Sequence, residues 1–182
     1  MDWRNRVEVT PGFCILWAFL ILTLPLKFLL TAALAALIHE ACHGLAVQRM
    51  GGRILSVTIG AGGMVMEVTD LDAVGELFCA LAGPVGSLLL ACVPVPGLAL
   101  CGLVQGIFNL LPLMPMDGGR VLGILLELTV PKSRGRIQSI VEVLVCGLLL
   151  MGAWRLGTGA VILWMALVSR KFPCKPGGKR VQ

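Results

Sequence analysis

The stretch ALIHEACHGLA, residues 36–46, holds both histidines of the chain, with a glutamate between them. On a helix, His39 and His43 are four residues apart, so both imidazoles project from one face about a turn apart. Two imidazoles so placed can bind one zinc ion. Glu40, roughly 100° around the helix, can then act as general base on a zinc-bound water. The spacing predicts metal-assisted hydrolysis.

The surroundings of this motif are strongly apolar. Hydrophobic residues make up 57% of the 182 residues and charged residues 14%, and the mean hydropathy is +0.92. The apolar residues come in long blocks, which predicts a polytopic membrane protein. An ionisable residue inside a membrane is costly unless it is paired or coordinated, so it is a functional candidate by default. A polar contact between helices is the alternative, but it explains the H-E-x-x-H spacing poorly.

A catalytic zinc needs a third protein ligand and an open fourth position. No third histidine exists, so a carboxylate or thiolate must serve. Asp117 is the main candidate, because prolines and glycines interrupt the apolar stretch NLLPLMPMDGGR around it, and membranes tolerate non-helical backbone only beside protein or water. Capping of the following helix is its alternative role. Glu127 and Glu142, within apolar blocks, and Cys42, beside the histidines, stay open as ligands.

The elements that must position these residues are helices. We expect an all-α polytopic membrane protein with about six transmembrane helices and a small β-hairpin after the zinc-binding helix. The hairpin is predicted as Ile54–Ile59 paired with Met64–Val68, because β-branched alternation flanks GAGG. One transmembrane domain that carries the metal motif is expected over residues 1–170, followed by a short basic tail, 171–182. The expected spans are Pro11–Leu26, Phe28–Met50, Ala73–Val93, Leu98–Pro131 with its interruption, Ile137–Ala153 and Leu156–Val168.

The distribution of positive charge predicts orientation. Lys and Arg cluster in short segments on one side of the six predicted spans, with only Lys27 and Arg155 on the other, so we expect a multi-pass protein of the cell membrane with both termini in the cytoplasm. His43 precedes Arg49 by six residues, about 9 Å of helix, which places the motif towards the cytoplasmic face. The net charge of +5 forms no basic stripe, and no nucleic-acid partner is expected.

The motifs together resemble those of the site-2 protease family of intramembrane zinc metalloproteases, most closely the stage IV sporulation branch. HEACH in one span is followed by NLLPLMPMDGG in a later one. SVTIGAGGMVMEV stands where that branch has a hairpin, and ALAGPVGSLLLA is similar to its glycine- and proline-containing third core span. The likeness covers roughly residues 10–130. Ser87 stands where the family often has asparagine, so a polar contact there is expected to differ.

The resemblance implies His39, His43 and Asp117 as zinc ligands and Glu40 as the group that activates water. It also implies that Asn109 orients the substrate or stabilises the transition state. The implied function is regulated intramembrane proteolysis: cleavage of a membrane-tethered protein within or near its transmembrane segment. The sporulation likeness further implies a membrane-tethered transcription regulator as substrate. The bilayer and inhibitory membrane proteins are the other expected partners.

The predicted hairpin offers an unpaired strand edge that could hold an extended substrate by strand addition; a hairpin that merely packs over the site is the alternative. Two other functions stay open. One is another membrane peptidase with H-E-x-x-H, such as a prenyl-protein processing enzyme, whose third ligand is generally a glutamate. The other is a catalytically inactive membrane protein of the same fold that binds partners.

Overall fold

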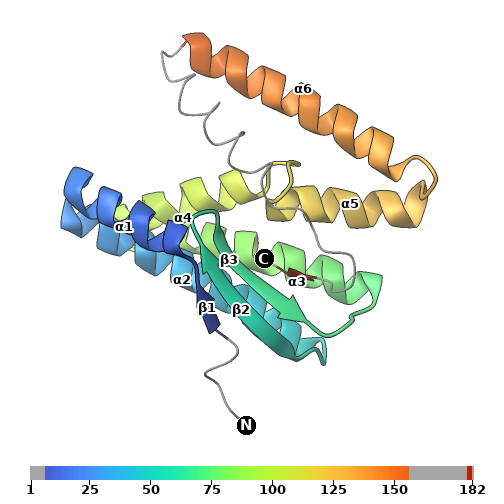
Figure 1. The fold of residues 1–182 in the computed structure, drawn as a ribbon, viewed down its shortest axis with the longest axis horizontal. Helices are drawn as coiled ribbons and strands as arrows, with labels where there is room; N and C mark the ends of the chain where they lie inside the picture. The colour runs from blue at the N-terminus through green and yellow to red at the C-terminus, as the bar shows by residue number, and fades with distance from the viewer. Residues whose placement is uncertain (1–6, 156–179, 182) are drawn as a thin grey trace.

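The computed structural model describes residues 7–155 and 180–181. Within this part the protein is mostly helical, with a small sheet on one side of the helices (Figure 1). The elements, in chain order, are β1 (Val7–Val9), α1 (Pro11–Thr23), α2 (Leu26–Arg49), β2 (Ile54–Gly60), β3 (Gly63–Val68), α3 (Ala73–Leu89), the 3₁₀ turn η2 (Leu90–Cys92), α4 (Pro96–Asn109), α5 (Asp117–Thr129), α6 (Arg134–Arg155) and β4 (Arg180–Val181).

Three stretches of helix in this part are long and apolar enough to cross a membrane: Leu26–Arg49, Ala73–Cys92 and Pro131–Trp154. The helices α1 and α4 are apolar but shorter. Large hydrophobic side chains along these helices are exposed, Leu22 at 86% and Trp154 at 84%, as expected for surfaces that face lipid. The protein is therefore a membrane protein. The number of six spans stays a prediction, and the expected last span, 156–168, lies outside the described residues.

Prolines mark where several helices begin. Pro11 and Pro96 stand at the starts of α1 and α4, and Pro25 precedes α2. Proline suits this position because the first backbone N–H groups of a helix have no partner within the helix. The interrupted fourth span is two helices, α4 and α5, joined by the non-helical segment 110–116.

The predicted hairpin is present as β2 and β3, which pair antiparallel, with Ile59 opposite Met64. Its two-residue turn ends at Gly63, whose φ of +117° favours glycine. Two further strands were not expected. β1 pairs in parallel with β2 over Val57–Ile59, and β4 pairs with β3 at Met66 and Glu67.

These strands shorten the unpaired edge that the hairpin was expected to offer. Among the described residues, β1 covers the outer edge of β2 at Val57–Ile59, and β4 covers the outer edge of β3 at Met66 and Glu67, which leaves Gly63–Val65 as the longest free part of the β3 edge. The cause lies in the chain's arrangement in space. The residues just before α1 run beside the hairpin, which sequence alternation within the hairpin could not reveal (Figure 1).

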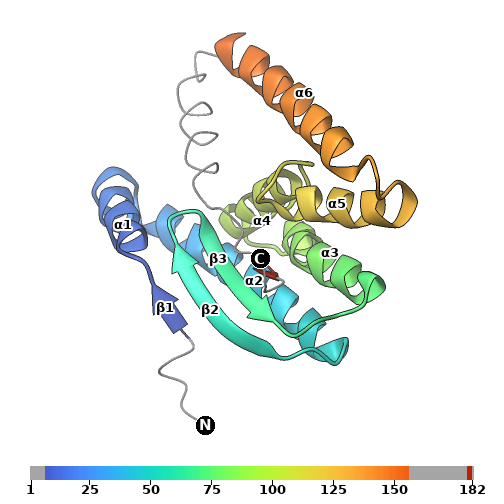
Figure 2. The same cartoon turned by 45° about the vertical axis from the view of Figure 1, so that its right-hand side comes forward.

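The helices α2, α3, α4 and α5 form the centre of the fold, where α3 contacts the other three. Glycines permit the close approach: a Cβ at Gly102 of α4 would lie 2.6 Å from the Ser87 carbonyl oxygen of α3. The hairpin packs over this bundle through a buried cluster of Val47, Met66, Val68 and Cys79. Figure 2 shows the sheet in front of α2.

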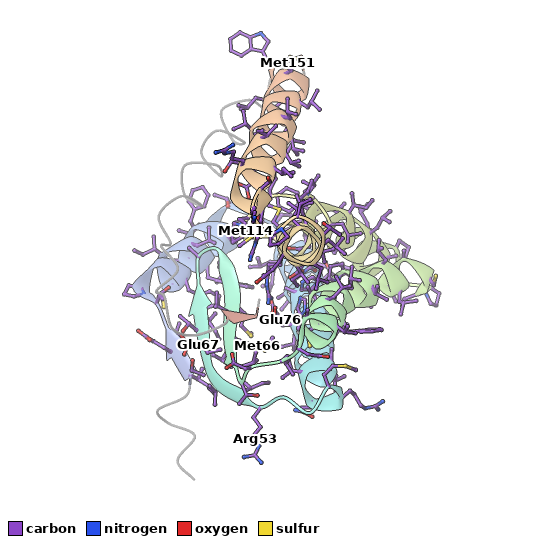
Figure 3. The ribbon with its side chains drawn as sticks, turned by 90° about the vertical axis from the view of Figure 1, so that its right-hand side faces the viewer. Arg53, Met66, Glu67, Glu76, Met114 and Met151 are labelled. Atoms are coloured by element: carbon purple, nitrogen blue, oxygen red, sulfur yellow. The ribbon has the colours of Figure 1, made fainter. Side chains whose placement is uncertain are left out.

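The helix α6 projects away from this centre and packs against α5 (Figure 2). Its exposed side chains extend outwards, and Met114 lies where α6 approaches α5 (Figure 3). The Met114 backbone N–H donates to Glu142 Oε1 at 3.4 Å, which connects α6 to the segment that precedes Asp117.

Candidate metal centre

The two histidines lie on the face of α2 that packs against α3. His39 is 3% exposed and His43 is fully buried. Their Nε2 atoms are 3.2 Å apart. The helix continues through the motif without a break, so the four-residue spacing brings both imidazoles to one point, as the sequence predicts.

Asp117 reaches the same point from a distant part of the chain. It is the first residue of α5 and is 1% exposed. The glycines that follow allow segment 110–116 to fold back on the helix: a Cβ at Gly118 would lie 2.2 Å from the Leu110 carbonyl oxygen, and one at Gly119 would lie 2.5 Å from that of Leu113. The carboxylate thus points at the histidines from the start of a helix, where a negative charge is favourable.

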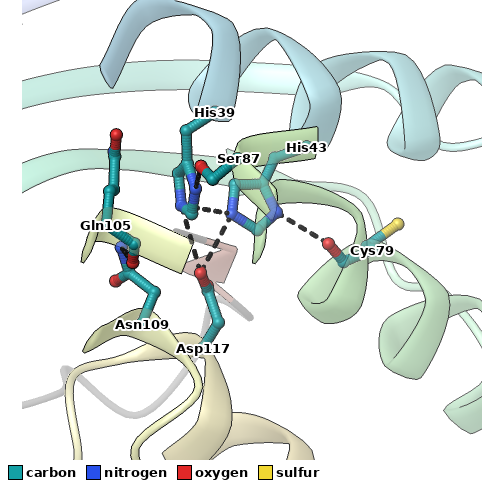
Figure 4. Close-up of polar contacts among 7 residues, drawn as sticks. All are labelled: His39, His43, Cys79, Ser87, Gln105, Asn109 and Asp117. Carbon is teal, nitrogen blue, oxygen red and sulfur yellow. Dashed lines mark hydrogen bonds and ion pairs between the residues drawn. The ribbon is translucent and has the colours of Figure 1, made fainter. Parts of the chain in front are cut away.

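The three side chains form a nearly equilateral group of potential ligands. Asp117 Oδ2 lies 3.2 Å from His39 Nε2 and 3.2 Å from His43 Nε2 (Figure 4). Tetrahedral ligands about 2.0–2.1 Å from a zinc ion are roughly 3.3–3.4 Å from each other. The group His39, His43 and Asp117 therefore has the donor types and the spacing of a three-ligand zinc site.

Hydrogen bonding on the far side of the His43 ring favours a cation at this point. His43 Nδ1 lies 2.7 Å from the Cys79 carbonyl oxygen, which can only accept, so Nδ1–H donates. The Nε2 of a neutral His43 then carries a lone pair, which faces the lone pairs of the Asp117 carboxylate at 3.2 Å. Such contact between acceptors is unfavourable unless a cation or an extra proton lies between them. The two-nitrogen, one-oxygen donor set fits zinc.

Two carboxylate oxygens at this centre are buried without a hydrogen-bond partner, Oδ1 of Asp117 and Oε2 of Glu40. A buried carboxylate oxygen without a partner is costly, and such groups in native proteins usually serve a function. Asp117 Oδ1 can bind the metal or a water. Glu40 is half-buried on α2, between the two histidines in sequence, and its unpartnered oxygen can accept a proton from a water at the metal.

Asn109 is the last residue of α4, the helix that the segment 110–116 joins to Asp117 (Figure 4). Its Nδ2 donates to the Gln105 carbonyl oxygen at 3.1 Å. Asn109 is not part of the group of potential metal ligands, and its contact with substrate stays a prediction.

The alternative third ligands lie elsewhere. Glu127 is paired with Arg134, with Oε2 and Nη1 2.5 Å apart, at the protein surface. Glu142 interacts with Gln138 and with the Met114 backbone. Cys42 packs against Gly86, where a Cβ would lie 2.3 Å from its Sγ. Among the described residues, only Asp117 completes a group with the two histidines.

Sequence reasoning did not identify what holds the imidazoles. His39 Nδ1 and Ser87 Oγ are 2.8 Å apart, and a Cβ at Gly83 would lie 2.1 Å from His43 Nε2. Ser87 was noted only as a departure from a family pattern. The sequence did show a serine and glycines in this apolar span, Ser87 and Gly83 among them. It could not show which imidazole each of them contacts, because that depends on how α3 packs against α2.

Comparison with known proteins agrees with this geometry. The model of Peptidase family M50 matches residues 92–152, which include Asp117 and Asn109. A putative zinc metalloprotease from Synechocystis is 33% identical over 134 residues, covering 63% of this chain and 35% of that protein. A zinc metalloprotease from Methanocaldococcus jannaschii is 29% identical over 109 residues, covering 51% of this chain and 32% of that protein.

The chain spans about a third of the length of these curated relatives. Its fold is that of a solved structure, a site-2 protease from Methanocaldococcus jannaschii, with a TM-score of 0.67 and 20% identity over 95% of this chain and 94% of that one.

Proposed function

We propose that this chain is an intramembrane zinc endopeptidase of the site-2 protease type, which cleaves another membrane protein within or near a transmembrane segment. One observation carries the proposal: His39, His43 and Asp117 meet at zinc-ligand spacing among helices that can cross a membrane. The M50 match and the two metalloprotease relatives support the same reaction class.

The chain's own residues supply the other parts of a hydrolytic site. Bound zinc would polarise the scissile carbonyl and make a water more acidic. Glu40 Oε2 accepts the proton of the attacking water and then returns it to the leaving amine. Asn109 contacts the substrate near the scissile bond. The buried setting of the histidines and Asp117 keeps bulk water away from the charges that develop.

We place the cut towards the cytoplasmic side of the membrane. The motif lies near the end of α2 that leads to Arg49 and the hairpin, and the positive charges of the chain gather on that side. The proposal keeps six spans with both termini in the cytoplasm. A membrane-tethered transcription regulator, released by the cut as in the sporulation branch, is the expected type of substrate, and inhibitory membrane proteins are expected regulators.

Proteolysis in liposomes tests the proposal. A helix hides its backbone, so the test substrate is a single transmembrane segment with helix-breaking Asn and Pro residues, tagged at both ends. We expect the reconstituted chain to cleave it, a zinc chelator to abolish cleavage, and added zinc to restore it. A substrate with an all-leucine segment is the control and should stay intact. Cleavage that continues in zinc-free protein would contradict the proposal.

We further propose that the extended substrate docks along the free part of the β3 edge, Gly63–Val65. Met66 and Val68, further along the strand, pack in one cluster with Cys79, whose carbonyl binds His43. A strand added at Gly63–Val65 would thus be continuous with elements that touch the metal group.

A photo-reactive amino acid at Met64 tests this docking surface. In a Glu40→Gln background, we expect it to crosslink to the test substrate. The same amino acid at Leu22, which is 86% exposed on α1, is the control and should capture little. Equal capture at the two positions would argue against the β3 edge.

A further inference from the structure

One helix, α3, contacts both imidazoles of the metal group. The Cys79 carbonyl oxygen accepts from His43 Nδ1, and the Ser87 hydroxyl lies 2.8 Å from His39 Nδ1 (Figure 4). Gly83 stands midway between them, and any Cβ there would occupy the place of the His43 ring. The face of α3 is therefore shaped to the pair of rings.

The contact of α3 with His43 uses a backbone atom, whereas its contact with His39 uses a side-chain atom. The Cys79 carbonyl belongs to the backbone and is present whatever the side chain. The Ser87 hydroxyl is a side-chain group, and Ser87 is fully buried. The orientation of His39 therefore depends on the identity of one residue, whereas that of His43 follows from the helix itself.

We propose that Ser87 is a positioning residue for zinc, which holds His39 with its Nε2 towards the metal. The inference rests on the proposed zinc site. His39 Nε2 lies 3.2 Å from Asp117 Oδ2, and it must be unprotonated to bind a metal. The proton then resides on Nδ1, and the Ser87 hydroxyl accepts it as a hydrogen bond. Such a partner fixes both the tautomer and the orientation of a ligating histidine.

A purely structural role makes a different prediction. Ser87 also lies where α4 approaches α3, since its backbone carbonyl is close to Gly102, and a small residue suits that contact. Alanine would satisfy this requirement as well as serine does. Serine and alanine at position 87 should therefore differ in zinc binding only if the hydroxyl itself has a role.

Zinc affinity measured against a competing chelator, in detergent-purified full chain, decides between these roles. We expect Ser87→Ala to bind zinc about 10–100-fold more weakly than wild type, the usual cost of losing such a partner. Ser87→Thr, which keeps the hydroxyl, should recover most of the affinity. Ser56→Ala is the matched control, because it removes a half-buried serine hydroxyl that bonds Glu67 in the hairpin. It should bind zinc as wild type does.

Cobalt provides a second readout that a packing role would not change. The visible absorption of the Co²⁺-loaded Ser87→Ala protein should differ from that of wild type, because the His39 ring is no longer held, and Ser87→Thr should restore the wild-type spectrum. Equal zinc affinity and an unchanged spectrum in Ser87→Ala would overturn the role of Ser87 while leaving the zinc site intact. A wild type that binds no zinc would overturn the proposed function as well.

Discussion

Replacing Asp117 with alanine is expected to remove most of the zinc that the wild-type chain retains through purification. The reason is geometric: Asp117 Oδ2 is 3.2 Å from each histidine Nε2 and is the only carboxylate of the described residues in that group. Loss of an outer partner of a ligand weakens metal binding about 10–100-fold, so loss of a ligand should cost more than 100-fold. Zinc per chain, measured by elemental analysis, checks this.

Two further variants test whether zinc loss in the Asp117 variant comes from loss of a ligand. Asp117→Asn keeps the volume of the buried side chain but removes its charge, and it should lose zinc as the alanine variant does, which separates ligand loss from a packing defect. Glu127→Ala removes an exposed carboxylate paired with Arg134 and should keep about one zinc per chain. Full zinc in Asp117→Ala would show that the third ligand lies elsewhere.

Replacing Glu40 with glutamine is expected to slow proteolysis about 10²–10⁴-fold while zinc binding persists. Glu40 adjoins His39, one of the proposed ligands, and its Oε2 is buried without a partner. An amide cannot take up the proton of the attacking water, and general-base catalysis contributes about 10²–10⁴-fold. We therefore expect cleavage of the tagged substrate to fall by a factor in that range. The liposome assay and a zinc measurement on the same preparation check both parts.

The control for Glu40 is Glu127→Gln, which makes the same chemical change at the protein surface and should leave cleavage unaffected. A Glu40→Gln protein that cleaves at the wild-type rate would disprove the role of general base. Loss of zinc together with activity would instead show that Glu40 holds the metal.

Local sequence spacing was sufficient for part of the site. His39 and His43 lie on one face of any helix that contains both, so their meeting follows from helical geometry alone. The hairpin is equally local, because β-branched alternation and the glycines of its turn are neighbours in sequence, and the predicted strands agree with β2 and β3 to within one residue at each end.

Local sequence spacing could not predict contacts between segments that are distant in the chain. The sequence left Glu127, Glu142 and Cys42 beside Asp117 as third ligands, since nothing in a one-dimensional pattern says which carboxylate approaches α2. Asp117 was expected on an unwound segment, whereas the structure places it as the first residue of α5. The strand β1 was missed because the alternation of Val7, Glu8 and Val9 covers only three residues, fewer than a pattern needs to predict a strand.

The sequence by itself determined that this is a membrane protein with two imidazoles and a carboxylate within five residues of one helix, because composition and helical periodicity are local properties. The tertiary structure decided the rest of the metal centre. Asp117 lies 74 residues from His43 along the chain, and Ser87 lies 48 residues from His39. Side chains so far apart in sequence meet only through helix packing, and that packing depends on where glycines such as Gly83 and Gly118 let one backbone approach another.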